Sequence, residues 1–546
     1  MRYAPLVVAA ALVFGCSDAP RAFTPDAATP VRDAATSDLG PRDAAATDVP
    51  AVYDAGPAVD RPAVQSTHDF VLPGAPDDSP TRFAGAEDPS MAPTFVYPAD
   101  GTFIPPNLPS FEVHFRPGAG QDLFQVAFIG SVTVARFYTR CMPVNGGCVV
   151  SLDTDALGHV AEAALGRGTV SVQITGTRSP EGAAMGGAVG RSATITLGVT
   201  RNPLRGAVYW WASSGSIVRY DMGTPGAHAE RYLQGDPINC VGCHVLSRDG
   251  SRIWAGRFIP GILPTPILDV PTRNAVGASF AASFGTFSPD DTRFLASNGS
   301  TLYLMDGATG AAATGLAPNF PGSMPDWSPS GAQVVFARPH GFGGPTGHSG
   351  AADLMLMPWT GSAFGAATTL LASSDVNNYY PAFSPDNLWV LFNRSPDSSY
   401  NNLAAQLWVT RADGGAPTRL AHADDGDGNG DSWPKWTPFV ESTGGEVDEP
   451  LLWFTFSSRR DYGLRLQQQG TAADMRVTQL WMASFRPNTR NTDPSTPAFW
   501  LPFQNLDQGN HIAQWVPSLQ RQMCGDGGAC AAGETCIGGR CIGAPP

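Results

Sequence analysis

Three residues near the middle of the chain form a pattern with chemistry of its own. Cys240 and Cys243 are separated by two residues and His244 follows directly, in the sequence Cys-Val-Gly-Cys-His. This spacing is typical of c-type haem attachment, in which two thiols form thioethers and the imidazole binds the iron. From the residues alone, two alternatives stay open: a disulfide between the two cysteines, and a metal site without haem.

The first sixteen residues predict export. Arg2 gives a positive start, residues 4–14 form an apolar run too short to span a bilayer, and Gly15 and Cys16 follow. A small residue before a cysteine resembles the lipobox of bacterial lipoproteins, although Phe14 is larger than the residue usual there. We therefore predict a lipoprotein signal peptide over 1–16, with acylated Cys16 anchoring the protein in the bacterial cell envelope. Ordinary secretion is the alternative.

The other cysteines fall into locally even groups, which suits an oxidising, extracytoplasmic space. Cys141 and Cys148 are expected to close a small loop. The tail, residues 521–546, predicts a small disulfide knot whose four cysteines pair among themselves: Cys524, Cys530, Cys536 and Cys541. Zinc is a weaker alternative for the tail, because its spacings contain no Cys-x-x-Cys pair.

Composition predicts an all-β protein. Charged residues make up only 15% of the chain, whereas Gly (61) and Pro (49) are abundant, so turns are many and long surface helices few. The net charge of −14 argues against nucleic-acid binding, because no basic stripe is present to neutralise phosphates.

Residues 17–88 are rich in Ala, Asp and Pro and predict a disordered tether.

Short alternating strands follow the tether. Period-2 segments separated by Pro and Gly turns, such as residues 111–115 and 124–128, predict a β-sandwich over 89–202. The stretch from Tyr97 to Thr102 resembles the first strand of immunoglobulin-like modules.

A repeated turn then organises residues 203–520. Each copy begins with an apolar residue, and Ser or Thr follows in most copies. The next position is usually Pro, and Asp or Gly often comes after it. Most copies precede an apolar strand. They begin at Leu246, Phe287, Trp327, Phe383 and Trp436, with a weaker sixth at Trp515. The first three recur about every 40 residues, the length of one four-stranded propeller blade.

Taken together, these copies resemble the TolB-type β-propeller repeat. The resemblance implies a propeller, and the number of copies predicts six blades. The sixth copy runs straight into the Cys-rich tail, so its outer strands must come from residues 207–211 and 216–220. Closing the ring with strands from both ends removes free sheet edges.

The repeat alignment also places the haem motif. His244 aligns with prolines that lead into the turn in later blades, which predicts a position nearest the channel axis at one mouth. His511, with Met324 as the alternative, is the candidate second axial ligand at the same level. A hydrogen-bonding histidine at a channel mouth is the other interpretation of His511.

An acidic loop is a candidate calcium site. Asp425, Asp427, Asn429 and Asp431 are spaced two residues apart with Gly between them, as in the start of a calcium-binding loop. The closing Glu of an EF-hand is missing, because residue 436 is Trp. An ordinary Asp/Gly surface turn is the alternative.

The leading hypothesis is a membrane-anchored, extracytoplasmic propeller that carries one covalent haem for electron transfer or redox sensing. Its partners would be the membrane, through the lipid anchor, and a protein or redox partner at the channel face. The alternative is a non-catalytic binding or scaffold lipoprotein in which Cys240 and Cys243 form a disulfide. No Ser or Cys lies in a recognisable nucleophile elbow, which favours a non-enzymatic role.

Overall fold

The fold is described from a computed structural model of the chain. Its described residues are 66–180, 186–235, 240–258, 262–317, 319–341, 343–344, 347–348, 350–424, 426, 428–445, 448–472, 475–489, 492–524 and 530–546. The predicted signal peptide, Cys16, Asp425 and Asp427 lie outside these residues, as does the side chain of Cys240. In the described segments no helix is long and apolar enough to cross a membrane.

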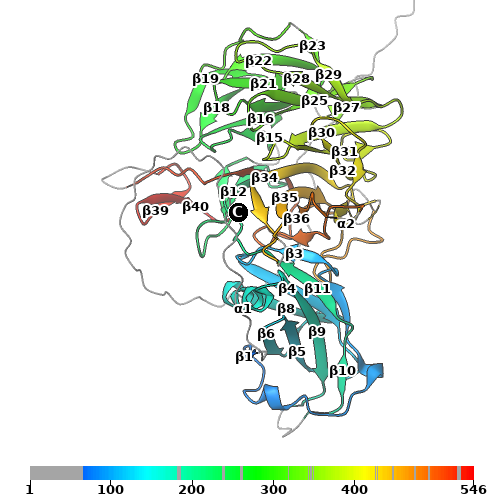
Figure 1. Cartoon of the computed structure of the whole chain (residues 1–546). Helices are drawn as coiled ribbons and strands as arrows, with labels where there is room; N and C mark the ends of the chain where they lie inside the picture. The colour runs from blue at the N-terminus through cyan, green and yellow to red at the C-terminus, as the bar shows by residue number, and fades with distance from the viewer. Residues whose placement is uncertain are drawn as a thin grey trace, which may run out of the picture.

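The N-terminal part is a two-sheet β-sandwich (Figure 1). One sheet has the order β1 (Ser66–Val71), β6 (Thr133–Thr139), β5 (Leu123–Ile129), β9 (Thr169–Thr177), β11 (Ile195–Val199) and β3 (Thr102–Ile104), with β10 (Val189–Arg191) beside β9. The other has the order β2 (Thr94–Tyr97), β4 (Ser110–Arg116), β8 (Gly147–Asp153) and β7 (Met142–Val144). Alternation along β4 and β5 buries Phe115 against Phe124, with ring centroids 4.9 Å apart.

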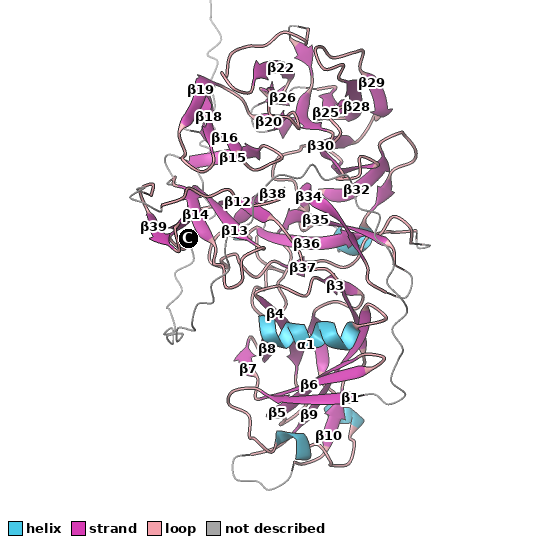
Figure 2. Ribbon diagram, turned by 60° about the vertical axis from the view of Figure 1, so that its left-hand side comes forward, coloured by secondary structure: helices cyan, strands magenta, loops and turns pink. Residues whose placement is uncertain are grey.

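One helix interrupts the strands. Helix α1 (Thr154–Ala164) begins at Asp153, whose carboxylate accepts a hydrogen bond from the backbone N–H of Ala156. Its apolar side, which includes Leu157 and Val160, is buried in the sandwich core, and Figure 2 shows the helix lying across the sandwich.

The predicted tether is too long at its C-terminal end. Strand β1 pairs in parallel with β6 over its whole length, and short 3-10 turns follow at Ser79–Thr81 and Pro89–Met91. The reason is Phe70, whose ring stacks on Phe137 at 5.1 Å. One partly buried aromatic, packed against the sandwich core, thus anchors a segment whose Asp- and Pro-rich composition otherwise favours disorder.

The described residues after the sandwich form six four-stranded antiparallel units, as the repeat predicted. The strands of each blade are given from the innermost outwards. Blade 1 consists of β15 (Cys240–Leu246), β16 (Arg252–Phe258), β18 (Thr265–Asp269) and β19 (Ala275–Phe280), with β17 (Ile262–Leu263) beside β16. Blade 2 consists of β20 (Phe284–Phe287), β21 (Arg293–Ser297), β22 (Thr301–Asp306) and β23 (Phe320–Pro321). Blade 3 is β24 (Ser323–Trp327), β25 (Gln333–Pro339), β28 (Ala352–Pro358) and β29 (Thr368–Leu371), with a small hairpin of β26 (Gly343–Gly344) and β27 (Gly347–His348).

The remaining blades complete the ring. Blade 4 consists of β30 (Asn377–Phe383), β31 (Trp389–Ser395), β32 (Gln406–Arg411) and β33 (Thr418–Arg419), and helix α2 (Ala421–Asp424) follows it. Blade 5 consists of β34 (Ser432–Ser442), β35 (Pro450–Ser458), β36 (Gln479–Phe485) and β37 (Phe499–Trp500). Blade 6 joins the two ends of the propeller segment: β38 (Asn510–Val516) pairs with β12 (Ala207–Ala212), followed by β13 (Ser216–Asp221) and β14 (Glu230–Leu233).

The repeated turn has a physical function in the blades. In blade 1 the hydroxyl of Ser247 donates to the carboxylate of Asp249 at 2.6 Å and accepts from the backbone N–H of Arg252 at 2.9 Å. Equivalent pairs occur at Ser288 with Asp290 and at Ser384 with Asp386. The Ser and Asp of the motif therefore tie the tight turn to the start of the next strand.

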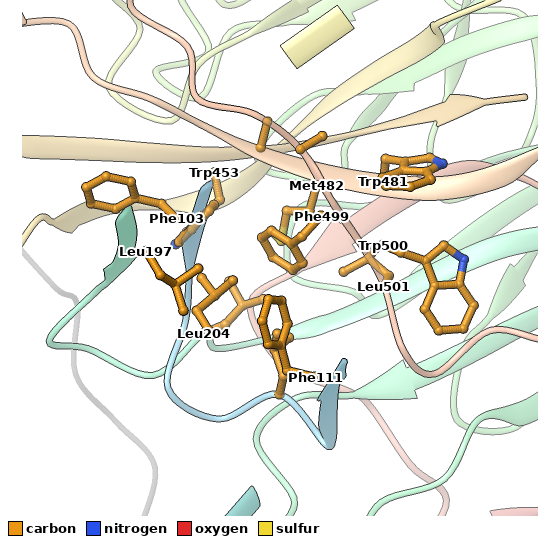
Figure 3. Close-up of a cluster of buried hydrophobic side chains, with 14 of the residues drawn as sticks. Phe103, Phe111, Leu197, Leu204, Trp453, Trp481, Met482, Phe499, Trp500 and Leu501 are labelled. Carbon is orange, nitrogen blue, oxygen red and sulfur yellow. The ribbon is translucent and has the colours of Figure 1, made fainter. Parts of the chain in front are cut away.

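The sandwich and the propeller share one continuous core. Phe103, Phe111 and Leu197 of the sandwich pack with Trp453 and Phe499 of blade 5, as Figure 3 shows. Beside this core lies a polar knot around Glu112, which accepts hydrogen bonds from the ring of His114, the hydroxyl of Tyr462 and the guanidinium of Arg465. Burial opposes ionisation of Glu112, yet these hydrogen bonds lower its pKa to about 2.

The tail is a disulfide-bonded hairpin that docks on blade 6. Strands β39 (Glu534–Ile537) and β40 (Arg540–Gly543) pair with each other, and the disulfides join Cys524 to Cys536 and Cys530 to Cys541. The sandwich contains the Cys141–Cys148 disulfide. All four tail cysteines are thus in disulfides, as the spacing predicted.

Candidate functional site: the channel mouth

The Cys-Val-Gly-Cys-His motif lies on β15, the innermost strand of blade 1. Pairing with β16 breaks between Val241 and His244, so that Gly242 and Cys243 together face the single residue Gly256. This arrangement is a β-bulge, which bends a strand and redirects its side chains. The motif is therefore placed on a bulged strand rather than on a helix.

The same bulge recurs around the ring. Innermost strands in blades 3 to 6 show a register shift at the equivalent place. At each of these bulges a non-glycine residue has a positive φ: Met324 (53°), Tyr380 (49°), Trp433 (55°) and Ile512 (60°). Because bulky residues rarely adopt this conformation, its repetition shows that the fold holds these side chains in a required direction.

These side chains meet at the axis. The ring of Phe284, from the unbulged strand of blade 2, lies 6.1 Å from the rings of both Tyr380 in blade 4 and Trp433 in blade 5. Tyr380 stacks on Trp433 at 3.8 Å, and Met324 joins the same buried cluster. We call the six residues at this level the plug: Cys243, Phe284, Met324, Tyr380, Trp433 and Ile512.

The structure corrects the predicted position of His244. The residue of blade 1 at the plug level is Cys243, which precedes the turn residue Leu246 by three positions, as Tyr380 precedes Phe383 and Trp433 precedes Trp436. His244 instead lies in the blade interior with 1% of its surface exposed, near the backbone carbonyls of Tyr209 and Gly242. Its own carbonyl accepts a hydrogen bond from the side chain of Gln514 at 2.5 Å, which ties β15 to β38 of blade 6.

Among the described residues, the imidazole of His244 makes no hydrogen bond of normal geometry. Both ring nitrogens are buried, and the carbonyls of Tyr209 and Gly242 lie near them without closing a full hydrogen bond. Burial lowers the pKa of His244 to about 4, so the ring is neutral at physiological pH. A buried polar atom without a partner costs about 1–3 kcal/mol. A neutral imidazole with an unused lone pair is also the form that binds a metal.

Cys243 carries a free thiol, and it is partly exposed. Burial of its sulfur raises the pKa of the thiol to about 12, so it is protonated and a poor nucleophile in this fold. The proximity of Cys243 adds to the effect of burial in raising the pKa of Tyr380 well above its usual value. The thiol therefore lies beside the aromatic residues of the plug.

His511 and Met324 both reach the plug. The ring of His511 lies edge-on to Trp433 with centroids 5.8 Å apart, and its Nδ1 is buried without a partner. Burial and the nearby charge of Arg459 lower the pKa of His511 to about 3. Among the described contacts, none joins His511 or Met324 to His244.

Charged residues also join the innermost strands of different blades. Asp326 of blade 3 pairs with the ammonium of Lys435 in blade 5 at 3.3 Å and accepts from the backbone N–H of Phe383 in blade 4 at 2.8 Å. Arg248 of blade 1, which replaces the proline of other turns, donates to the carbonyl of Trp327 in blade 3. These contacts tie blades 1, 3, 4 and 5 together near the turns, in addition to the plug.

The structure describes only part of the candidate calcium loop. Asp431 is fully buried and one of its carboxylate oxygens accepts from the guanidinium of Arg460 at 2.7 Å, while the other has no partner. Burial raises the pKa of Asp431 to about 7. The backbone carbonyl of Asn429 accepts from the N–H of Arg459 at 2.8 Å. Asp431 thus faces the blade interior, and calcium binding would depend on its free oxygen.

Metal-binding clusters are otherwise rare in the described residues. The one group of three or more His, Cys, Asp or Glu side chains close enough to share an ion is Cys524, Cys530 and Cys541. All three form disulfides, so they are not available as ligands.

Sequence reasoning missed the plug as a unit. The signal was present, because aligning the turns places an apolar side chain three residues before the turn aromatic in the later blades, as in Tyr380 and Trp433. It also missed the ion pairs of the tail, in which partners are hundreds of residues apart. Arg219, for example, bonds Glu534 at 3.4 Å.

The sequence matches no known protein-family model, and it matches no curated protein. Solved structures resemble it only distantly. TolB from Acinetobacter baumannii is 13% identical with a TM-score of 0.36, covering 65% of this chain and 81% of its own. A protein assigned as TolB from Agrobacterium tumefaciens is 16% identical with a TM-score of 0.29, covering 58% and 100%. Hydrazine synthase from Kuenenia stuttgartiensis is 10% identical with a TM-score of 0.30, covering 54% and 91%. The propeller assignment therefore rests on the six blades themselves.

Proposed function

We propose that the first blade carries one covalent haem, attached at Cys240 and Cys243 with His244 as an iron ligand. The observation that carries this proposal is the unpaired, neutral imidazole of His244 directly after a Cys-x-x-Cys pair. The free thiol of Cys243 agrees with it, because a thioether requires a thiol that is not in a disulfide. A haem would supply one-electron chemistry for electron transfer or redox sensing.

Different residues of the chain would have different functions around a haem. The two cysteines would hold it, and His244 would offer a lone pair to which no donor among the described residues is bound. His511 and Met324 are candidates for the second iron ligand, with His511 favoured by its unpaired Nδ1. The plug would shield the group from the rest of the channel. A redox partner would then approach from the mouth on the motif side.

An absorption spectrum tests the proposal. Protein made in a host with cytochrome c maturation should give a pyridine haemochrome spectrum that survives acid-acetone extraction. The Cys240→Ala/Cys243→Ala variant should lose it, whereas the Cys141→Ala/Cys148→Ala variant, a matched change of two cysteines in the sandwich, should keep it. The proposal would be contradicted by a colourless matured protein in which the mass of the peptide with Cys240 and Cys243 is lower by two hydrogens, as a disulfide requires.

The alternative is a non-catalytic binding scaffold. It is supported by the stacked rings of Tyr380 and Trp433 and by the ion pair of Asp326 with Lys435, which join the innermost strands of different blades as a scaffold requires. In that case Cys240 and Cys243 would form a disulfide that staples the first blade, and the mass measurement above separates the two functions.

We also propose that the mature protein begins at an acylated Cys16 and is held in the bacterial cell envelope. The disulfides of the sandwich and tail support an oxidising compartment. Intact mass of the mature protein tests the anchor, and Cys16→Ala should release the protein from membranes. A mature N-terminus at any other residue would rule out the lipoprotein.

Calcium binding by the loop at Asp425, Asp427, Asn429 and Asp431 stays a proposal. It is supported by the unpaired oxygen of the fully buried Asp431. Calcium in the millimolar range should raise the melting temperature by mass action, and Asp425→Asn/Asp427→Asn should abolish the shift. Identical melting curves in calcium and in chelator would assign the loop as an ordinary turn.

A further inference from the structure

A cavity lies at the junction of the sandwich and the propeller, far in sequence from the haem motif. Its volume is about 460 Å³. The sandwich contributes the turn at Asp100 and the segment that follows α1, and the propeller contributes α2 and the loop between β36 and β37. Cavities of roughly 300–1,000 Å³ accommodate small organic molecules.

Positive side chains face this cavity from both domains. Arg167 lines it on the sandwich side, and Arg486 lines it on the blade 5 side, with His422 beside them. Each guanidinium carries a permanent charge and several N–H donors, which is the chemistry that binds a carboxylate.

The two acidic residues of the lining are already used by the protein. The carboxylate of Asp100 accepts from the backbone N–H of Thr196 at 2.6 Å. One oxygen of Asp493 accepts from the N–H of Ser495 at 2.8 Å, and the other accepts from the N–H of His422 at 2.7 Å. Asp493 also lies 3.4 Å from Nδ1 of His422 and accepts from the hydroxyl of Ser495 at 2.7 Å. Both carboxylates are therefore bound to donors in the cavity wall.

The arginines keep donors available. Within the described residues, the guanidinium of Arg167 has no hydrogen-bond or ion-pair partner. Among the contacts of the described residues, Arg486 donates from Nη2 to Glu449 at 3.2 Å, which leaves its Nη1 as the donor for a ligand. The guanidinium of Arg486 also lies over the ring of Phe103, 5.2 Å from its centroid, which holds the plane of its donors in one orientation.

We propose that this junction cavity binds a small organic acid. The unused guanidinium donors suit a carboxylate, which arginine binds through paired hydrogen bonds. Phe103, Pro494 and Pro497 supply apolar wall for the carbon skeleton. The volume exceeds what an inorganic anion fills, so the ligand is a molecule of the size of a sugar acid or a tricarboxylic acid.

Thermal shift and calorimetry of the full mature chain test the site. The probes are galacturonate and citrate at up to about 10 mM, with galactose as the neutral control and sulfate at matched ionic strength as the inorganic control. At least one organic acid should raise the melting temperature, whereas galactose and sulfate should not. No shift with either acid, or an equal shift with sulfate, would overturn the proposal.

Variants locate the binding. Arg167→Ala should fold normally, because its side chain has no partner, and should weaken binding about tenfold to a hundredfold through the loss of charged hydrogen bonds. Arg178→Ala, a matched change at an exposed arginine of the sandwich outside the cavity, should bind as the wild type does. Equal affinity in the two variants would place the ligand elsewhere and overturn the assignment of this cavity.

Discussion

The ring of Phe284 in blade 2 lies 6.1 Å from the ring of Tyr380 in blade 4, so the two side chains meet past the innermost strand of blade 3. A contact between non-adjacent blades requires that both side chains point towards the centre of the ring. The six blades therefore depend on a shared centre as well as on their neighbours, and the positive φ of Tyr380 is the local strain that this centre requires.

Removing an aromatic ring from the plug should lower the stability of the fold. Phe284→Ala leaves a cavity among Tyr380, Trp433 and Met324, and we expect it to lower the free energy of unfolding by about 3–5 kcal/mol. Urea denaturation followed by tryptophan fluorescence measures the change. Leu388→Ala, at a propeller residue that is 49% exposed, should change it by less than about 0.5 kcal/mol. Similar losses in both variants would show that the plug adds no stability.

The buried histidines should make the haem-free protein sensitive to acid. The folded-state pKa of His244, about 4, is below the unfolded value of about 6.5, so the unfolded chain binds more protons as pH falls through 6.5. Stability from this group is present above pH 6.5 and is lost towards pH 4. Between pH 7 and pH 5, we expect His244 to account for a loss of about 2 kcal/mol.

The measurement is the difference between wild type and His244→Leu, because other groups titrate in the same range. Burial raises the pKa values of Asp291 and Asp431 to about 7, and these carboxyls destabilise the fold as pH rises, with the opposite sign. His68→Gln, at an exposed histidine of β1, is the control for removal of a histidine. An unchanged pH slope in His244→Leu would contradict the buried, neutral imidazole.

The architecture follows from local signals in the sequence. The Ser and Asp of each turn make short-range hydrogen bonds that recur with the blade, so both the repeat and the blade number can be predicted from residues such as Ser288 and Asp290. The need for outer strands in the last blade likewise predicts the pairing of β12 with β38, which the structure confirms.

The side-chain arrangement at the site depends on features that no local pattern reveals. Strand β15 has a bulge at Gly242 and Cys243, and the extra residue of a bulge cannot be recognised in the sequence of one strand. Residues 66–71 form a strand because Phe70 finds Phe137 across the sheet. The junction cavity is lined by Arg167, which follows α1 in the sandwich, and by Arg486 of the propeller. These two residues come to one cavity only through the packing of the two domains.

The sandwich and the propeller should unfold as one unit. Glu112 of β4 bonds Tyr462 and Arg465 of blade 5 across the junction, and the hydrophobic core is continuous beside it. Glu112→Gln leaves the Arg465 charge without its partner and should lower the free energy of unfolding by about 2–3 kcal/mol.

Circular dichroism and tryptophan fluorescence should report the same single transition in the wild type. Glu162→Gln, on the exposed side of α1, is the matched control and should have little effect. Two separate transitions in the wild type would show that the domains are only loosely joined.

The disulfide-bonded tail should stabilise the closure of the ring. Arg219 of β13, which is nearly buried, bonds Glu230 of β14 at 3.0 Å and Glu534 of the tail at 3.4 Å, and Arg521 also pairs with Glu230. The guanidinium of Arg219 lies 4.8 Å from the ring centroid of Tyr232. Releasing the tail leaves Arg219 with one carboxylate and exposes the edge strand of blade 6.

We therefore expect Cys530→Ser/Cys541→Ser to lower the free energy of unfolding by about 2–4 kcal/mol and to open the tail to proteolysis. Thermal melting and mass analysis of limited digests measure the two effects. Cys141→Ser/Cys148→Ser removes a disulfide from the sandwich instead, and its tail should stay protected because the ion pairs with Glu230 and Glu534 are intact. A tail that resists protease after loss of Cys530 and Cys541 would show that the ion pairs alone hold it on blade 6.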